Sequence, residues 1–250
     1  MKFIKNILRL LWRTWFIIIA ALPVIVFAPV IYVSIAFDMQ KLFTWIKHLW
    51  GSWVLFWLGF RVEADQQAKI NPKKSYIIIG NHTSMMDIMV LLKLIRLPFV
   101  FVGKKELSKI PIFGYLYQKS NVMVDRNSPQ SRKEVYNQVQ KFIKDGNSIA
   151  IYPEGGVPDP EVLLAPFKIG AFRMAIEHQL PIIPMVYYDN KEKFPFDIWK
   201  GSPGKLRVKI LPVISTEGLT LKDVDDLRDY AYNLIYNELM NYNLSKDFKK

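Results

Sequence analysis

The stretch Gly80-Asn81-His82-Thr83-Ser84-Met85-Met86-Asp87 joins two apolar segments of different kinds. It follows residues 76–79, a run of β-forming side chains, and precedes residues 85–95, which are almost wholly apolar. This pattern predicts a strand followed by a helix. His82 and Asp87 then lie at the junction, where an imidazole and a carboxylate can act as an acid/base pair.

The spacing of His82 and Asp87 allows two interpretations. On one continuous helix the two side chains would lie about 140° apart and could not meet. If the helix begins near Ser84, Asp87 falls in its first turn and can reach back to the imidazole. Ser84 followed three residues later by Asp87 is also a simple capping box, with His82 as an ordinary loop residue. The stretch alone does not decide between the two.

The composition restricts the chemistry. The 250 residues contain no cysteine, so disulfides, a thiolate nucleophile and cysteine-ligated zinc are excluded. The histidines His48, His82 and His178 have no metal-ligand spacing, and we expect no metal site. A net charge of +12 favours an anionic membrane, a phosphorylated substrate or an acidic carrier. Nucleic acid is not an expected partner, because no basic recognition helix or RNA-binding signature is present.

Residues 1–60 have the character of a membrane anchor. Residues 15–37 carry no charge over 23 positions, more than the roughly 20 that a helix needs to cross a bilayer. Four cations precede this run and place the N-terminus on the cytoplasmic side: Lys2, Lys5, Arg9 and Arg13. A second apolar stretch covers residues 42–60, and six of the seven tryptophans lie in residues 1–60.

We therefore expect residues 1–60 to form an apolar helical hairpin, kinked at Pro23 and Pro29, that spans the membrane or lies half-buried in one leaflet. A hairpin returns residues 61–250 to the cytoplasmic side, whereas a single span would put them outside. A cleaved signal peptide and a pair of soluble core helices are the alternatives.

Residues 61–250 alternate strand and helix patterns and are expected to form one α/β domain. Strands are predicted at residues 76–79, 99–102, 121–124, 148–152, 182–188 and 206–213, and helices at residues 84–95, 128–144, 167–179 and 221–241. Such alternation predicts a mostly parallel sheet flanked by helices on both faces. Functional residues then gather at the carboxyl ends of the strands. Polar segments at residues 81–87, 103–107 and 152–156 all follow strands, so we expect them to converge.

These segments resemble, in order over roughly residues 75–190, the motifs of the lysophospholipid acyltransferase family, which makes phosphatidic acid from 1-acylglycerol 3-phosphate. The matching stretches are Asn81-His82-x4-Asp87, then Lys105-Glu106-Leu107 with Pro111-Ile112-Phe113-Gly114 and Val124-Asp125-Arg126, then Tyr152-Pro153-Glu154-Gly155-Gly156-Val157, Phe167-Lys168-x-Gly170-Ala171 and Leu180-Pro181-Ile182-Ile183-Pro184. The resemblance implies a glycerolipid acyltransferase-like fold behind an apolar N-terminal anchor.

The resemblance also implies roles for individual residues. His82 would be the catalytic base and Asp87 its orienting carboxylate. Substrate contacts are implied for a further set: Asn81, Lys105, Glu106, Gly114, Arg126, Glu154, Gly155, Gly156 and Lys168. For Lys105, Glu106 and Gly114 a purely structural turn is the alternative. Glu154 would either organise its loop or position the acceptor.

One departure from the family pattern concerns the acceptor. Family members usually carry threonine and arginine where this chain has Gly156 and Val157, and that arginine is thought to hold the acceptor phosphate. Arg126 and Lys168 are the best substitutes, with Lys104 and Lys105 as further options. Lys168 is expected at a helix start, which itself favours anions.

The implied reaction is acyl transfer from a thioester, on coenzyme A or an acyl-carrier protein, to the sn-2 hydroxyl of 1-acyl-sn-glycerol 3-phosphate, with no cofactor. The expected place is a bacterial inner membrane, with the catalytic domain on the cytoplasmic face. A lyso-aminolipid acceptor is the nearest alternative, because the arginine is missing. A membrane-tethered hydrolase would need a G-x-S-x-G elbow, which the sequence lacks. A membrane-binding module without catalysis is the third alternative.

Overall fold

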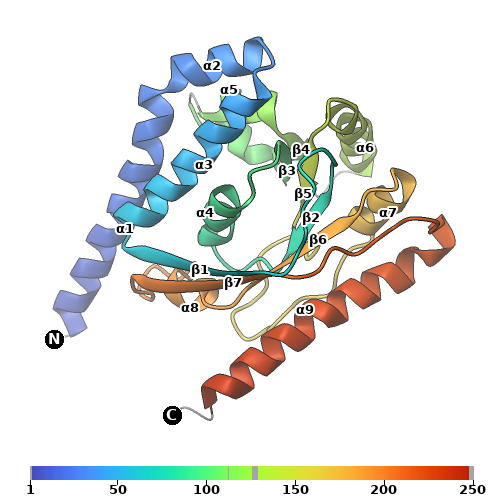
Figure 1. The fold of residues 1–250 in the computed structure, drawn as a ribbon. Helices are drawn as coiled ribbons and strands as arrows, with labels where there is room; N and C mark the ends of the chain where they lie inside the picture. The colour runs from blue at the N-terminus through green and yellow to red at the C-terminus, as the bar shows by residue number, and fades with distance from the viewer. Residues whose placement is uncertain (1, 112, 126–128, 248–250) are drawn as a thin grey trace.

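The computed structural model describes residues 2–111, 113–125 and 129–247 and is built around one seven-stranded sheet (Figure 1). The strands are β1 (Phe60–Gln66), β2 (Ile77–Gly80), β3 (Phe99–Lys104), β4 (Val122–Val124), β5 (Ser148–Ala150), β6 (Ile182–Tyr187) and β7 (Gly204–Ile210). The helices are α1 (Lys2–Val26), α2 (Ala28–Ala36), α3 (Gln40–Trp57), α4 (Met85–Leu94), α5 (Phe113–Ser120), α6 (Pro129–Lys144), α7 (Gly170–Glu177), α8 (Asn190–Lys193) and α9 (Val224–Asp247), with short 3-10 turns η1 (Lys105–Lys109) and η2 (Leu221–Asp223).

The sheet is mostly parallel, which confirms the expected α/β class. Its strand order is β1-β7-β6-β2-β5-β3-β4. Strand β2 pairs in parallel with β5 and β6, and β3 pairs in parallel with β4 and β5. Strands β1 and β7 are parallel to each other, and β7 joins β6 in antiparallel orientation. The carboxyl ends of β2, β5 and β3 therefore lie side by side at one edge.

Helices cover both faces of the sheet. Along β2, Ile78 belongs to the apolar cluster on the face of α3 and α4, whereas Ile77 and Ile79 belong to the cluster on the face of α7 and α9. All three isoleucines are at most 1% exposed. A strand buried on both faces reads as a continuous apolar run rather than an alternating one, and this explains the sequence of β2.

The N-terminal segment is an apolar helical hairpin, as predicted, with α2 as its connection. Figure 1 shows α1 and α3 lying beside each other, joined by α2 at the top. The chain turns at Phe27, between Pro23 inside α1 and Pro29 at the start of α2. Among the described residues, one helix, over Phe3–Val26, is long and apolar enough to cross a membrane.

The hairpin shares its core with the sheet. Ile19 of α1 and Val54 of α3, exposed by 1% and 0%, belong to the same apolar cluster as Ile78 and Ile183. Trp12 Nε1 also donates a hydrogen bond of 3.2 Å to the carbonyl of Leu58. Residues 1–60 therefore pack against residues 61–250 as part of one structure.

Several element boundaries differ from the sequence prediction. Strand β1 was not predicted, although Phe60, Val62 and Ala64 alternate with charged residues, which is typical of a half-buried strand. Helix α5 was also missed. The strand predicted at 206–213 runs over 204–210, the one at 148–152 ends at Ala150, and the helix predicted from residue 167 begins at Gly170.

Replacing Gly51 with alanine should destabilise the protein, because α3 and α4 approach closely at this glycine. A Cβ at Gly51 would lie 2.7 Å from Leu92 Cβ and 2.7 Å from the carbonyl oxygen of Met89. Overpacking of this kind costs about 1–3 kcal/mol, so the thermal unfolding midpoint should fall. Gly170→Ala is the matched control, since nothing lies within 4 Å of a Cβ there. Equal midpoints for the two variants would contradict the close contact.

Candidate active site

The loop between β2 and α4 brings His82 and Asp87 together. Ser84 is the N-cap of α4, in extended conformation, and its hydroxyl accepts a hydrogen bond from the backbone N–H of Met86. This cap starts the helix at Met85, so Asp87 lies in the first turn. His82 Nδ1 lies 3.0 Å from Asp87 Oδ2. The capping box and the His82–Asp87 contact are both present, because one carboxylate closes the box and holds the imidazole.

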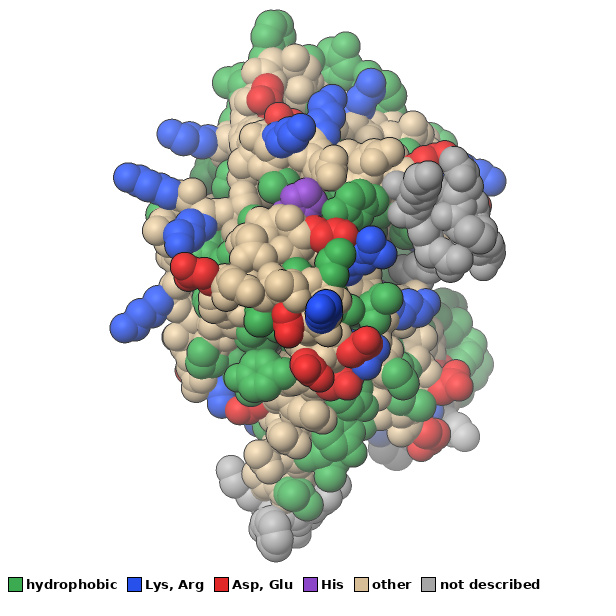
Figure 2. All heavy atoms as spheres, turned by 90° about the vertical axis from the view of Figure 1, so that its right-hand side faces the viewer, with side chains coloured by type: hydrophobic (Ala, Val, Ile, Leu, Met, Phe, Trp, Pro, Cys, Tyr) green, Lys and Arg blue, Asp and Glu red, His purple; other side chains and the backbone are tan. Residues whose placement is uncertain are grey.

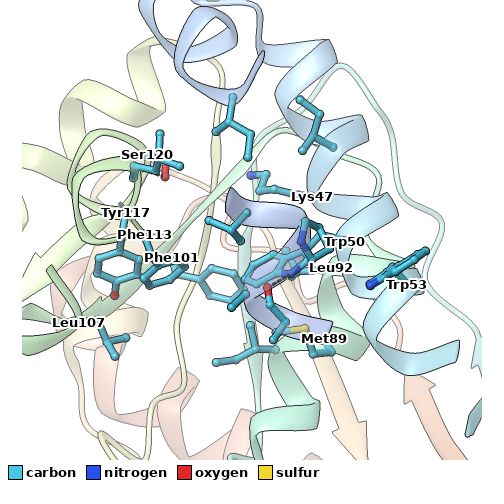
Figure 3. Close-up of a pocket in the computed structure, with 18 of the residues that line it drawn as sticks. Lys47, Trp50, Trp53, Met89, Leu92, Phe101, Leu107, Phe113, Tyr117 and Ser120 are labelled. Carbon is cyan, nitrogen blue, oxygen red and sulfur yellow. Dashed lines mark hydrogen bonds between the residues drawn. The ribbon is translucent and has the colours of Figure 1, made fainter. Parts of the chain in front are cut away.

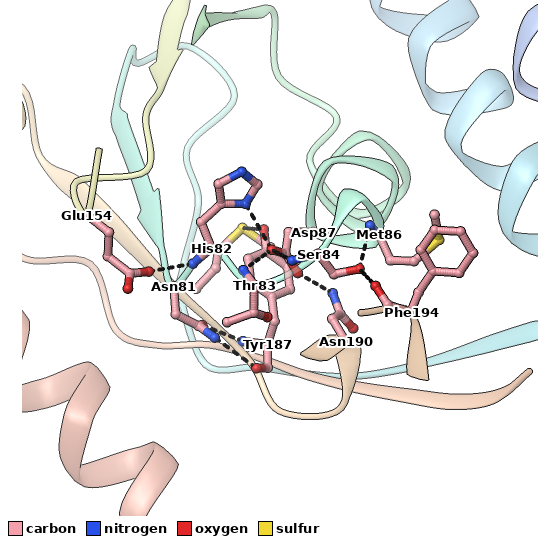
Figure 4. A network of polar contacts seen from close by, with 11 residues as sticks. Asn81, His82, Thr83, Ser84, Met86, Asp87, Glu154, Tyr187, Asn190 and Phe194 are labelled. Carbon is pink, nitrogen blue, oxygen red and sulfur yellow. Dashed lines mark hydrogen bonds and ion pairs between the residues drawn. The ribbon is translucent and has the colours of Figure 1, made fainter. Parts of the chain in front are cut away.

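The Asp87 carboxylate is 0% exposed and accepts several hydrogen bonds (Figure 4). Its Oδ2 accepts from the backbone N–H groups of Thr83 and Ser84, at 2.7 Å and 2.8 Å. Its Oδ1 accepts from Asn190 Nδ2 at 2.8 Å. Asn190 comes from α8, which is far away in the sequence, and no motif identified it. These donors fix the orientation of the carboxylate against the imidazole.

The tautomer of His82 follows from its partner. An ionised carboxylate can only accept, so the neutral ring carries its proton on Nδ1 and leaves Nε2 as the proton acceptor. Figure 4 shows Nδ1 turned to Asp87 and the other ring nitrogen pointing away from it. His82 lines an apolar cavity. The free nitrogen can therefore serve as a general base toward a substrate.

Tyr152 holds the opposite side of the imidazole. Its ring stacks on that of His82, with centroids 4.2 Å apart and planes inclined by 13°. Burial raises the pKa of the Tyr152 phenol well above its usual value, and Tyr187 and the charge of Asp87 add to this rise. Tyr152 thus remains a neutral aromatic platform. Its position directly after β5 is the sequence feature that could have identified it.

Glu154 links the loop after β5 to the loop after β2. Its Oε1 accepts the backbone N–H of His82 at 2.6 Å, and its Oε2 accepts the N–H of Ala165 at 2.8 Å. Glu154 is only 7% exposed. Burial raises its pKa, and the two N–H donors oppose that rise. Of the two roles considered for Glu154, these contacts support organisation of the loops.

Lys168 lies over the turn that Glu154 begins. Gly155 has a φ of +75°, and a Cβ on it would lie 2.5 Å from Lys168 Nζ. The backbone N–H of Lys168 donates to the carbonyl of Pro153 at 2.8 Å. Lys168 precedes the first residue of α7 by two positions and is exposed. It is therefore a cation beside the glycine turn, and Gly156 lines the same cavity as His82.

Other predicted site residues have contacts within the protein. The side-chain amide of Asn81 is 2% exposed and exchanges two hydrogen bonds with the backbone of Tyr187, at 2.9 Å and 3.0 Å. A Cβ on Gly114 would lie 2.1 Å from the carbonyl oxygen of Ser108. Asn81 thus fastens the loop between β2 and α4 to β6. Gly114 permits close packing of α5 on η1, the structural alternative considered for this turn.

The cations near the end of β3 differ in their position. Lys104 lines the cavity and forms a 3.4 Å ion pair with Glu106. Both side chains are more than half exposed, and such exposed pairs are weak. Lys105 is an exposed residue of η1. Arg126 lies outside the described residues.

A cavity of about 1590 Å³ extends from His82 between the sheet and the N-terminal helices. Its walls are overwhelmingly apolar, and Trp50, Met89 and Phe101 come together in it from α3, α4 and β3 (Figure 3). Helix α4 contributes both to this cavity and to the core: Met85 and Ile88 line the cavity, and Met86 and Val90 are fully buried. The arrangement suits a long apolar substrate whose reacting group lies beside His82.

The Ser84 hydroxyl does not act in this site. Ser84 is 0% exposed, and its Oγ donates to the carbonyl of Phe194 at 2.6 Å. Among the described residues, no three His, Asp or Glu side chains are grouped as metal ligands. The fold and the site thus define an α/β protein with a histidine–aspartate acid/base pair at the edge of an apolar cavity.

Residues 61–188, just over half of the chain, match the family model described as Acyltransferase, and the protein belongs to this family. It is 35% identical to the 1-acyl-sn-glycerol-3-phosphate acyltransferase of Haemophilus influenzae over 161 residues, which are 64% of this chain and 66% of that protein. It is 30% identical to the human 1-acyl-sn-glycerol-3-phosphate acyltransferase beta over 185 residues, covering 71% of this chain and 64% of that protein. The matched region spans about two thirds of the length of these relatives.

The fold is similar to that of a crystal structure from Thermotoga maritima, the 1-acyl-sn-glycerophosphate (LPA) acyltransferase PlsC. The TM-score is 0.79 at 22% sequence identity, and the likeness covers 97% of this chain and 98% of the other. The N-terminal hairpin is therefore included in the shared fold.

Glu154→Gln should displace His82. Glutamine offers one oxygen where the site presents two N–H donors, so one donor loses its partner and faces an NH₂ group. Loss of a hydrogen bond to a charged group costs about 1.5–3 kcal/mol, and the thermal midpoint and acyl transfer should both fall. Glu161→Gln, an exposed carboxylate in the same loop, is the control. Wild-type activity in Glu154→Gln would show that these bonds do not position His82.

Proposed function

We propose that the protein transfers an acyl group from a thioester to the sn-2 hydroxyl of 1-acyl-sn-glycerol 3-phosphate and so forms phosphatidic acid. The observation that carries the proposal is the His82–Asp87 pair beside a cavity large enough for acyl chains, in a member of the Acyltransferase family. Coenzyme A and an acyl-carrier protein are both suitable donors. No step needs a cofactor.

The proposed reaction begins with His82. Its Nε2 takes the proton of the acceptor hydroxyl as the oxygen attacks the thioester carbonyl. Asp87 stabilises the imidazolium that forms, as the carboxylate of a hydrolase triad does. The tetrahedral intermediate then collapses, the carbon–sulfur bond breaks, and the imidazolium protonates the leaving thiolate. One ester replaces one thioester, and the base is restored without a covalent enzyme intermediate.

The oxyanion of that intermediate needs hydrogen-bond donors. The N–H of Gly155 already donates to the carbonyl of Tyr152 at 3.1 Å. Within the described part of the chain, no hydrogen bond occupies the N–H of Gly156, and this residue lines the cavity beside His82. We assign the oxyanion contact to Gly156. Its lack of a side chain leaves room for the thioester carbonyl.

The acceptor phosphate needs a cation in place of the missing arginine. Lys168 is our choice, because its amine reaches over Gly155 next to the glycine turn. Lys104, by contrast, lines the cavity itself. A lyso-aminolipid acceptor would need no cation at this position. The one observation that favours this second candidate function is the replacement of the family's threonine and arginine by Gly156 and Val157.

The protein is proposed to lie on the cytoplasmic face of a bacterial inner membrane, with α1 in the plane of one leaflet. Arg13 donates to the carbonyl of Pro195 at 2.7 Å, so one side of α1 is bound to the α/β domain. On its other side Ile4, Leu8 and Leu11 are 61%, 60% and 61% exposed. An amphipathic helix of this kind binds along the interface. Crossing the bilayer would separate α1 from the domain that holds it.

His82→Ala should abolish most of the transfer without unfolding the protein. Loss of a general base lowers rates by about 10²–10⁴-fold. The assay combines purified protein with 1-acylglycerol 3-phosphate or a lyso-aminolipid as acceptor, and with acyl-coenzyme A or acyl-carrier protein as donor. His48→Ala, which removes a histidine of α3 outside the site, should keep wild-type activity. If only the lyso-aminolipid is acylated, the proposed acceptor 1-acylglycerol 3-phosphate is wrong and the lyso-aminolipid takes its place. Undiminished transfer by His82→Ala would refute the proposed role of His82 as the base.

Ile88→Trp should shift the enzyme toward shorter acyl chains. Ile88 is half-buried and lines the cavity, so a larger ring there reduces the length available to an apolar chain. The measurement is a competition between acyl donors of different length. Ile169→Trp, at an exposed position before α7, is the control. An unchanged length profile would mean that the acyl chain does not occupy this cavity.

A further inference from the structure

The segment at residues 195–203 lies against the N-terminal half of α1, although more than 180 residues separate Arg13 from its partners there. Arg9 Nη1 donates to the carbonyl of Trp199 at 2.7 Å. Arg13 Nη2 donates to the carbonyls of Pro195 and Lys200, at 2.7 Å and 2.9 Å. Helix and segment therefore form one continuous surface.

A hollow of about 460 Å³ lies between them and is rich in positive charge. It is lined by Lys5, Asn6 and Arg9 of α1 and by Trp199 and Lys200 of the segment. Within the described part of the chain, no acidic side chain forms an ion pair with Lys5 or Arg9. The hollow therefore presents three cations and an amide donor.

One carboxylate lies next to the hollow. Asp197 forms an ion pair with Lys200 at 3.4 Å and accepts the backbone N–H of Trp199 at 3.0 Å. The Lys200 side chain is 74% exposed, and ion pairs this exposed are easily exchanged for other anions. The remaining charge of the hollow is positive even with Asp197 included.

The segment on one side of the hollow carries exposed apolar side chains. Phe196, Ile198 and Trp199 are 53%, 45% and 48% exposed, and Trp199 itself lines the hollow. Trp199 is also the seventh tryptophan, and the other six lie in residues 1–60. Tryptophan prefers the headgroup level of a membrane, where lysine and arginine extend to lipid phosphates.

We propose that this hollow binds the phosphate of an anionic phospholipid in the membrane on which α1 lies. The volume is within the range of sites for small ligands, and the cations match the phosphate. Trp199 in the hollow and the exposed apolar side chains beside it in the sequence match the surrounding lipid. A soluble phosphate would leave the exposed Phe196, Ile198 and Trp199 unexplained. The proposal rests on the in-plane association of α1 and is independent of the acyl-transfer chemistry.

The face seen in Figure 2 differs from the hollow. Lysine and arginine side chains on that face lie among acidic side chains. In the hollow, three cations meet around one space with an aromatic side chain.

The test measures flotation of the full-length protein with vesicles of phosphatidylcholine, alone or mixed with phosphatidylglycerol. Lys5→Gln combined with Lys200→Gln should weaken binding to the mixed vesicles about tenfold, because each cation near an anionic surface contributes several-fold. Binding to pure phosphatidylcholine should not change. The matched control is Lys73→Gln with Lys74→Gln, which removes two exposed charges between β1 and β2.

Three results would overturn the proposal. Equal losses in the two double variants would mean that diffuse charge attracts the membrane. A parallel loss on pure phosphatidylcholine would mean that the substitutions disturb α1 itself. Displacement from mixed vesicles by inorganic phosphate at constant ionic strength would assign the hollow to a soluble anion. None of these readouts depends on whether the protein acylates 1-acylglycerol 3-phosphate.

Discussion

The buried carboxylate of Asp87 is the constraint on which the site depends. A carboxylate taken fully out of water needs hydrogen-bond donors in place of the water that it loses. Asp87 meets this requirement with donors from His82, Thr83, Ser84 and Asn190. The first three belong to the turn after β2, and the fourth belongs to α8. The carboxylate is therefore in place only when both parts of the chain have folded around it, and the imidazole is oriented by the same event.

The segment that supplies Asn190 also connects the turn of His82 to α1. Phe194 directly follows the last residue of α8. Its carbonyl accepts a hydrogen bond from the Ser84 hydroxyl, and its ring packs against Phe16 and under the guanidinium of Arg13, 3.8 Å from the ring centre. A displacement of α1 from the domain would thus reach the N-cap of α4 through a single residue, Phe194. This is a physical reason for α1 to be packed on the domain and not flexibly tethered to it.

Much of this arrangement was available in the sequence, because it is local. The apolar run before Gly80 predicts a strand buried on both faces, and Ser84 with Asp87 predicts where the next helix begins. The contacts that could not be predicted are long-range. Nothing in the sequence near Asn190 indicates that its side chain binds the carboxylate of Asp87, 103 positions earlier. The antiparallel pairing of β6 with β7 is of the same kind. Strand β1 is a different case. The alternation of apolar and charged residues in Phe60–Gln66 is local, but it directly follows the apolar stretch at residues 42–60, which is expected to belong to the anchor.

The cavity gives the anchor a role beyond attachment. Its walls include Trp50 and Trp53 of α3 and Ile17 of α1, so the space in which an acyl chain would lie does not exist without residues 1–60. An apolar chain leaving the bilayer would pass from lipid to these helices and then to His82 without crossing water. Exposure of acyl methylenes to water costs roughly 0.8 kcal/mol per group, so even a short aqueous passage would oppose the reaction. The apolar surface of the hairpin and the apolar walls of the cavity are therefore two sides of the same layer. In the proposed reaction, the position of His82 at the inner edge of this layer would keep the acyl chain out of water.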